Sequence, residues 1–375
     1  MKFVLAPDSF KESLTAKEVA DAMEIGIKRV LPDAKCIKVP MADGGEGTVQ
    51  SLVDGTNGTL YEVEVTGPIG NKVKARYGIL GDNETAVIEM AEASGIHYVQ
   101  GEERNPMLTT TFGTGEVIKA ALDKGIKKIL IGIGGSATND GGIGMLQALG
   151  GRFLDKEGNE IAFGGGSLDK LDKIDLSNFD ERIKDIELEV ACDVSNPLTG
   201  ENGASAIFGP QKGATPEMVK ILDENLEHFA KIVKDQVGKD FANEKGAGAA
   251  GGLGFALITF CQGCLKPGID IVIKYSNLEE KMKDASYVIT GEGCIDNQTK
   301  FGKTPYGVAQ IAKKFDIPVI AISGKLGEGY KELYNYGFDA LLSILPGIMT
   351  LDNALSSGKE NIENTVEDIV RLLNL

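Results

Sequence analysis

Short apolar runs alternate with amphipathic segments over the first part of the chain. Three such runs predict β-strands at residues 2–5, 36–39 and 60–65. Between the first two, Thr15 and Glu18 form a capping box, and an apolar stripe at helical spacing continues to Pro32. Because strands and helices alternate here, we expect a doubly wound parallel sheet.

The pattern changes after Gly67 and Pro68. Residues 73–80 and 85–90 predict a hairpin, which a purely parallel sheet would not contain. From residue 285 the first pattern returns, with strands expected at 287–290, 318–322 and 340–345. We therefore predict an α/β protein with two domains. Residues 1–68 and 284–375 form a discontinuous, doubly wound, Rossmann-like parallel-sheet domain, and residues 69–283 form an inserted mixed α/β domain.

A Gly-rich stretch at residues 128–151 lies within the inserted domain. Residues 129–133 predict a buried strand and residues 143–149 a helix, with Gly, Ser, Thr, Asn and Asp between them. Glycines let the backbone approach a ligand closely, and the free amides at the start of the helix attract anions. The stretch predicts a phosphate-binding loop, although a tight turn without a ligand has the same pattern.

Polar residues follow the predicted strands at six places. These loops are Asp8-Ser9-x-Lys11, Asp43-Gly-Gly-Glu46, Ser136-x-Thr138-Asn139-Asp140, Asp193-x-x-Asn196, Gly291-Glu-Gly-Cys-Ile-Asp296 and Ser323-Gly-Lys325. Ligands of parallel sheets bind beyond the carboxyl ends of the strands, so we expect the loops to line a cleft between the domains. Carboxylates beside phosphate-binding loops favour Mg²⁺. Any one Asp taken alone is also typical of a turn or a helix cap.

The chain contains only two histidines, His97 and His228. His228 lies in the middle of a predicted helix, so proton removal is expected to fall to an Asp. Lys303 precedes a predicted helix, but Asn297 stands where a Walker A loop needs its first glycine. We expect Thr304 to cap that helix, with Lys303 just outside its N-terminus, which suits a phosphate.

Two other function classes remain open at this stage. Gly132-x-Gly134-x-x-Ala137 fits a dinucleotide fingerprint, so an NAD-dependent hydroxy-acid oxidoreductase is one alternative. Its acidic partner would fall near Asp155, in a predicted hairpin, which weakens this interpretation. A non-catalytic nucleotide sensor is the other alternative.

Composition narrows the possible partners and the compartment. The net charge of −16 and the lack of tryptophan argue against nucleic acid as a partner. The N-terminal apolar run is too short for a signal peptide, and no apolar stretch is long enough to span a membrane. Five scattered cysteines agree with a reducing compartment, so we expect a cytoplasmic protein. The oligomeric state, monomer or homodimer, stays open.

Longer blocks of sequence resemble the bacterial glycerate kinase family, the group related to the enzymes of glycerate and glucarate breakdown. The blocks are PDSFKESLTA from Pro7, MADGGEGT from Met41, EMAEASGI from Glu89, GIGGSATNDGG from Gly132, DVSNPLTG from Asp193, FGPQKGA from Phe208, GAAGGLG from Gly248, and ITGEG, DNQT and GKTPYGVA between Ile289 and Ala309. The resemblance implies transfer of a phosphoryl group from ATP to a hydroxyl of D-glycerate, with Mg²⁺. It favours 2-phosphoglycerate as the product.

On the residues and this resemblance together, we assign hypothetical roles. The catalytic residues are Asp193 or Asp296 as the base, and Lys303. Backbone and hydroxyl groups that bind ATP phosphates are those of Gly134, Gly135, Ser136, Thr138, Gly291 and Gly293. The residues that bind D-glycerate are Asp8, Ser9, Lys11 and Lys212. Asp43 and Glu46 help to hold Mg²⁺.

One residue departs from the family pattern. The block that we expect reads Gly-Glu-Gly-Arg, and here its fourth position is Cys294. If the arginine normally holds a carboxylate or a phosphate, its role passes to Lys11, Lys212 or Lys303, or the affinity for the substrate differs.

Overall fold

The chain divides into two compact units in the computed structural model, which describes residues 1–375. The first unit consists of residues 1–43, 50–57 and 269–375, and the second of residues 44–49 and 58–268. The sequence places the domain boundaries at 68 and 284, further along the chain than these divisions. The segment 44–49 is an excursion of the chain into the second unit that the sequence pattern does not indicate.

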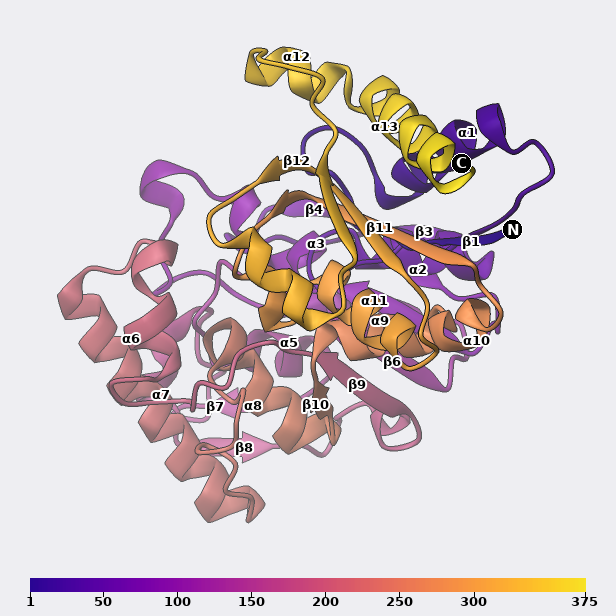
Figure 1. Cartoon of the computed structure of the whole chain (residues 1–375). Coiled ribbons are helices and arrows are strands. Elements are labelled where there is room, and N and C mark those ends of the chain that lie inside the picture. Colours follow the sequence, from indigo (N-terminus) through magenta and orange to yellow (C-terminus); the bar gives the residue numbers. More distant parts are fainter. The chain divides into compact units, whose positions relative to one another are not determined.

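A parallel sheet of five strands forms the centre of the first unit, in the order β13-β12-β11-β1-β2. The strands are β1 (Lys2–Leu5), β2 (Lys35–Lys38), β11 (Tyr287–Ile295), β12 (Val319–Leu326) and β13 (Ala340–Ser343). The helices are α1 (Ala16–Val30), α2 (Thr48–Thr56), α9 (Gly268–Tyr275), α10 (Leu278–Met282), α11 (Thr304–Lys313), α12 (Leu351–Ser356) and α13 (Gly358–Leu373), with 3-10 turns at Thr299–Phe301 and Tyr330–Tyr336. Figure 1 shows α1 and α13 on one face of the sheet and α11 on the other.

Helix α1 begins where the capping box predicts. The Thr15 hydroxyl accepts a hydrogen bond from the Glu18 amide, and the Glu18 carboxylate accepts one from the Thr15 amide. The apolar stripe of α1 packs with α13 against the strands, and Phe3, Leu5 and Met23 are fully buried there. The predicted parallel-sheet architecture is therefore confirmed for this unit.

A mixed sheet of six strands, in the order β10-β9-β6-β5-β4-β3, forms the centre of the second unit. The strands are β3 (Thr59–Thr66), β4 (Lys72–Ile79), β5 (Thr85–Glu89), β6 (Lys128–Gly132), β9 (Glu187–Ala191) and β10 (Cys264–Lys266), and a separate ribbon pairs β7 (Arg152–Leu154) with β8 (Lys173–Asp175). The predicted hairpin is confirmed, because β4 and β5 pair antiparallel.

The prediction that residues 60–65 form a third parallel strand of the first sheet is wrong. β3 lies at the edge of the second sheet and pairs antiparallel with β4. Its side chains alternate between more and less exposed positions, as in an antiparallel edge strand with one face exposed to solvent. The turn at Gly67–Gly70 reverses the chain, with the Gly67 amide bonded to the Asn71 carbonyl.

Helices cover the second sheet and enclose a large apolar core that contains Phe153, Phe229 and Phe255. They are α3 (Ala91–Ser94), α4 (Phe112–Leu122), α5 (Ile143–Ala148), α6 (Ala204–Phe208), α7 (Pro216–Val237) and α8 (Ala249–Cys261), with 3-10 turns at Ile96–Tyr98, Gly101–Glu103, Gly165–Lys170, Glu181–Lys184 and Pro210–Lys212. Helix α8 is interrupted near its start, since Ala250, Gly251 and Gly252 all have positive φ. No helix of the chain is both long enough and apolar enough to span a bilayer.

We predict that Gly26→Ala destabilises the first unit. A Cβ at Gly26 of α1 would lie 2.5 Å from the Glu363 carbonyl and 3.0 Å from the Val366 Cβ of α13, so the two helices would have to move apart. Such overpacking costs about 1–3 kcal/mol. Urea unfolding of the purified variant measures the change.

Gly55→Ala is the matched control for this measurement. Gly55 also lies in a helix, but a Cβ there would meet no atom within 4 Å. This substitution should stabilise the protein slightly, by about 0.4–1 kcal/mol, because it restricts the unfolded chain. Equal effects of the two substitutions would contradict the packing argument.

Candidate active site

Parallel strands bring the first group of predicted site residues together. Asp8 follows β1, and its amide donates a hydrogen bond to the Gly291 carbonyl of β11 (2.8 Å). A Cβ at Gly293 would lie 3.8 Å from the amide nitrogen of Lys11, so that loop passes directly over β11. Lys11 itself is exposed. The structure therefore unites Asp8, Lys11 and the two glycines at the carboxyl edge of one sheet.

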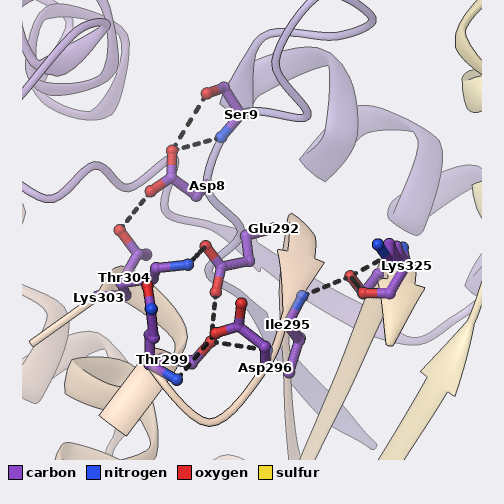
Figure 2. A network of polar contacts seen from close by, with 11 residues as sticks. Asp8, Ser9, Glu292, Ile295, Asp296, Thr299, Lys303, Thr304 and Lys325 are labelled. Carbon is purple, nitrogen blue, oxygen red and sulfur yellow. Dashed lines mark hydrogen bonds and ion pairs between the residues drawn. The ribbon is translucent and has the colours of Figure 1, made fainter. Parts of the chain in front are cut away.

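The Asp8 carboxylate is the centre of a hydrogen-bond network (Figure 2). Its Oδ2 accepts a hydrogen bond from the Thr304 hydroxyl (2.5 Å), and its Oδ1 accepts one from the Ser9 amide (2.6 Å). Burial raises the pKa of Asp8 to about 6, against the hydrogen bond from Thr304, and the nearby charge of Asp43 raises it further. Ser9 and Asp43 are thus each close enough to influence Asp8.

Glu292 is a site residue that the sequence reasoning missed. Its Oε1 accepts a hydrogen bond from the Thr299 hydroxyl (2.8 Å), and its Oε2 lies 3.5 Å from the Lys303 Nζ. Burial raises the pKa of Glu292 to about 7, although the charge of Lys303 opposes the shift. The sequence does contain a signal for this residue. Glu292 lies between Gly291 and Gly293 and is the only carboxylate in that Gly-rich strand end.

Helix α11 begins differently from the prediction. Lys303, not Thr304, is the N-cap residue, and its side chain makes no capping hydrogen bond. Thr304 is the first helical residue, and its hydroxyl is directed to Asp8 instead. Asp296 lies in the preceding turn, where its Oδ1 accepts a hydrogen bond from the Gln298 amide (2.8 Å). Lys303 therefore stands at the start of a helix of ten residues, as expected for a group that binds an anion.

In the second unit, the Gly-rich loop lies against the segment 44–49. A Cβ at Gly132 would lie 2.5 Å from the Gly44 carbonyl, and one at Gly134 would lie 3.9 Å from the Gly45 Cα. The approach at Gly132 is too close for a Cβ and explains the glycine at that position, whereas the contact at Gly134 is an ordinary one. Gly134, Gly135 and Glu46 are exposed, so backbone amides and a carboxylate are accessible at the same edge.

The amides at the start of α5 are already bonded, which contradicts the expectation that they are free for a phosphate. The buried carboxylate of Asp140 accepts hydrogen bonds from the amides of Gly142 (3.0 Å) and Gly144 (3.3 Å). It also accepts bonds from the amide and the hydroxyl of Thr111 (2.8 and 2.9 Å). Asp140 thus occupies the place at the N-terminus of α5 where a phosphate was expected. The exposed part of the loop is Gly134 and Gly135.

Lys212 supports the same loop from inside the protein. Its side chain is buried, and its Nζ donates a hydrogen bond to the Thr138 carbonyl (2.7 Å). Burial lowers the pKa of Lys212 to about 7, against the charge of Asp140. Thr138 and Asn139 are also buried, and the Thr138 Oγ1 and the Asn139 Oδ1 make no hydrogen bond in the structure. Ser136, another predicted phosphate ligand, is buried beside them.

Two more carboxylates lie at this edge. Glu89 ends β5, is buried, and accepts a hydrogen bond from the Val49 amide (2.8 Å), and burial raises its pKa to about 7. The sequence reasoning placed Glu89 in a family block but gave it no role. Asp193 follows β9, and its Oδ1 accepts a hydrogen bond from the Gly268 amide (2.9 Å). Because β5, β6 and β9 are parallel neighbours, their ends meet here.

The carboxylates suit a metal that is held mainly by a nucleotide. No group of three or more His, Cys, Asp or Glu side chains is arranged to hold a metal ion. Mg²⁺ typically takes one or two protein carboxylates and fills its other positions with phosphate oxygens and water. The two carboxylates that the sequence assigns to Mg²⁺ are Asp43, whose charge reaches the buried Asp8, and Glu46, which is exposed.

Comparison with known proteins gives a consistent result. The profile of the glycerate kinase family matches residues 3–374. A protein of Bacillus subtilis named glycerate kinase is 56% identical, and the match covers 100% of this chain and 98% of that protein. A protein of Escherichia coli named glycerate 2-kinase is 52% identical over 100% of this chain and 98% of its own length.

A crystal structure agrees with these matches. It is that of a Salmonella typhimurium LT2 protein assigned as glycerate kinase 2, which is similar with a TM-score of 0.92 and 50% identity. The alignment covers 100% of this chain and 98% of that one. Sequence and fold therefore agree over the whole length, and the chain belongs to the glycerate kinase family.

Proposed function

We propose that the protein transfers the terminal phosphoryl group of ATP to D-glycerate and forms 2-phosphoglycerate. The similarity to a protein named glycerate 2-kinase, which extends over the whole chain, carries this proposal. Membership of a kinase family leaves the oxidoreductase and the nucleotide sensor without support. The location of the site in a cleft between the domains and the cytoplasmic location of the protein stay predictions.

The nucleotide would bind at the edge of the second unit. The exposed backbone of Gly134 and Gly135 would donate hydrogen bonds to phosphate oxygens. Asp140 and Lys212, both buried, would keep that loop in one conformation so that the amides need no reorganisation during the reaction. Mg²⁺, held in part by Asp43 and Glu46, would neutralise charge on the phosphates.

D-Glycerate would bind at the edge of the first unit. Lys303 at the start of α11 and the exposed Lys11 are the cations available for its carboxylate and for the transferred group. Asp8 and Ser9 would bind its hydroxyls, while Asp193 or Asp296 would accept the proton of the attacking hydroxyl. Phosphoryl transfer by an in-line route depends mostly on positioning and charge balance, and these residues supply both.

Phosphorus NMR of the reaction of ATP with D-glycerate tests the proposed function. We expect a phosphomonoester signal that splits by coupling to one proton, as 2-phosphoglycerate requires. Coupling to two protons would identify 3-phosphoglycerate and contradict the regiochemistry. Absence of any phosphoglycerate would contradict the proposed function itself.

We predict that Asp193→Asn or Asp296→Asn lowers kcat by about 100-fold or more, because one of them acts as the base. Turnover of each variant under saturating ATP and D-glycerate measures the loss. The assignment is wrong if both variants turn over at nearly the wild-type rate. Asp175→Asn is the matched control, since the Asp175 Oδ1 accepts a hydrogen bond from the Ser177 amide (2.9 Å), as Asp296 does from Gln298.

We predict that Lys212→Met changes the pH dependence of stability. The pKa of Lys212 falls from 10.5 to about 7 on folding, so between these values the unfolded chain holds a proton that the folded protein lacks. The free energy of unfolding should therefore rise with pH in this range, by up to about 1.4 kcal/mol per pH unit, and Lys212→Met should remove this contribution.

Urea unfolding at pH 7, 8 and 9 makes the comparison. The free energy of unfolding of the wild type, minus that of Lys212→Met, should grow as the pH rises. A Met substitution of Lys231, an exposed lysine in α7, should leave the curve parallel to that of the wild type. Parallel curves for Lys212→Met as well would mean that Lys212 keeps its proton in the folded state.

A further inference from the structure

Lys303 and Glu292 are held together at the edge of the first sheet (Figure 2). Glu292 extends from β11, and Lys303 stands at the N-terminus of α11. Their charged groups approach to 3.5 Å, between the Glu292 Oε2 and the Lys303 Nζ. The contact therefore joins the carboxyl-terminal part of β11 to the N-terminus of α11.

The second carboxylate oxygen of Glu292 is engaged as well. The Thr299 hydroxyl donates to the Glu292 Oε1 at 2.8 Å, and Thr299 is fully buried. The same hydroxyl oxygen accepts a hydrogen bond from the Asp296 amide (3.3 Å). With one oxygen held by a buried hydroxyl, the other oxygen faces Lys303. The direction of the carboxylate is therefore set before any ligand binds.

Exposure differs between the two partners. The side chain of Glu292 is 14% exposed, whereas that of Lys303 is 33% exposed. The glutamate side chain is thus more enclosed by the protein than the lysine side chain. A lysine ammonium has three donors, and a single contact at 3.5 Å leaves donors for an incoming oxygen anion.

We propose that Glu292 is a positioning residue that holds the Lys303 ammonium at the start of α11 for phosphoryl transfer. This inference rests on the proposed function, in which Lys303 balances charge on the transferred group. A lysine has a flexible stem of four carbons, and a fixed carboxylate limits where its ammonium group can lie. Because the contact exists before the reaction, the cation needs little reorganisation as charge develops.

The expected effect of Glu292→Gln follows from this role. Glutamine keeps the hydrogen bond to Thr299 but loses the charge that holds Lys303. We expect kcat to fall by about 10-fold, because a misplaced group costs transition-state stabilisation. KM for each substrate should change less than about 3-fold, because the interaction is made mainly in the transition state.

A double-mutant cycle separates positioning from an independent role. We expect Lys303→Met to lower kcat by about 100-fold, and Glu292→Gln to add little to it, because the two residues act as one unit. Thr299→Val, which frees the carboxylate without changing its charge, should give a smaller loss in kcat with the same small change in KM. Glu332→Gln is the control, since it breaks the nearby ion pair of Lys300 at 2.6 Å and should leave kcat unchanged.

Several outcomes overturn the proposal. If the loss in the double variant equals the product of the two single losses, Glu292 acts independently of Lys303. If Glu292→Gln raises KM and leaves kcat unchanged, the residue only binds substrate. If circular dichroism shows that Glu292→Gln is unfolded, Glu292 has a structural role and its kcat is not informative. The kcat of Thr299→Val then tests the proposal, and a wild-type value would contradict it. If the wild type makes no phosphoglycerate, the proposed function fails first and this inference fails with it.

Discussion

Parallel strands deliver all their carboxyl-terminal loops to one edge of a sheet, and both units depend on this constraint. In the first unit, β1 and β11 bring Asp8 beside Gly291 although the two are far apart in sequence. In the second, β5, β6 and β9 bring Glu89, Gly134 and Asp193 to one edge. The register matters as much as the order, because a slip of one residue would turn each strand side chain to the opposite face.

Each edge contains charged groups that burial alone would neutralise. Burial disfavours the charged forms of Glu292 and Lys212, and in each case an opposite charge, Lys303 or Asp140, acts against the shift. Such pairs contribute little net stability, because the cost of desolvation offsets their attraction. Their retention is better explained by what they hold in place: a lysine in the first unit and a Gly-rich loop in the second.

The parts that the sequence predicts well are those that depend on local pattern. Asp8 and Asp193 are recognisable because each comes one or two residues after a short apolar run that forms a strand, and Asp296 because it follows the Gly-rich end of β11. The pairing of β3 is not local, and its alternating pattern suits an edge strand of either sheet. Glu292 and Glu89 carry no local signal of a buried carboxylate, because their burial arises from tertiary packing. The hydrogen-bond donor of Glu89, Val49, is 40 residues away along the chain.

The start of α5 shows why a correct motif can still mislead about its ligand. The amides of Gly142 and Gly144 attract an anion, as the pattern indicates, but that anion is the protein's own Asp140. A phosphate placed there would face a buried carboxylate, so we expect the ligand at the outer part of the loop, at Gly134 and Gly135. Glu46 is exposed beside that part, and a carboxylate next to a phosphate is favourable only when a cation lies between them. Glu46 would repel ATP without a metal, so its presence beside the loop favours ATP bound together with a divalent cation.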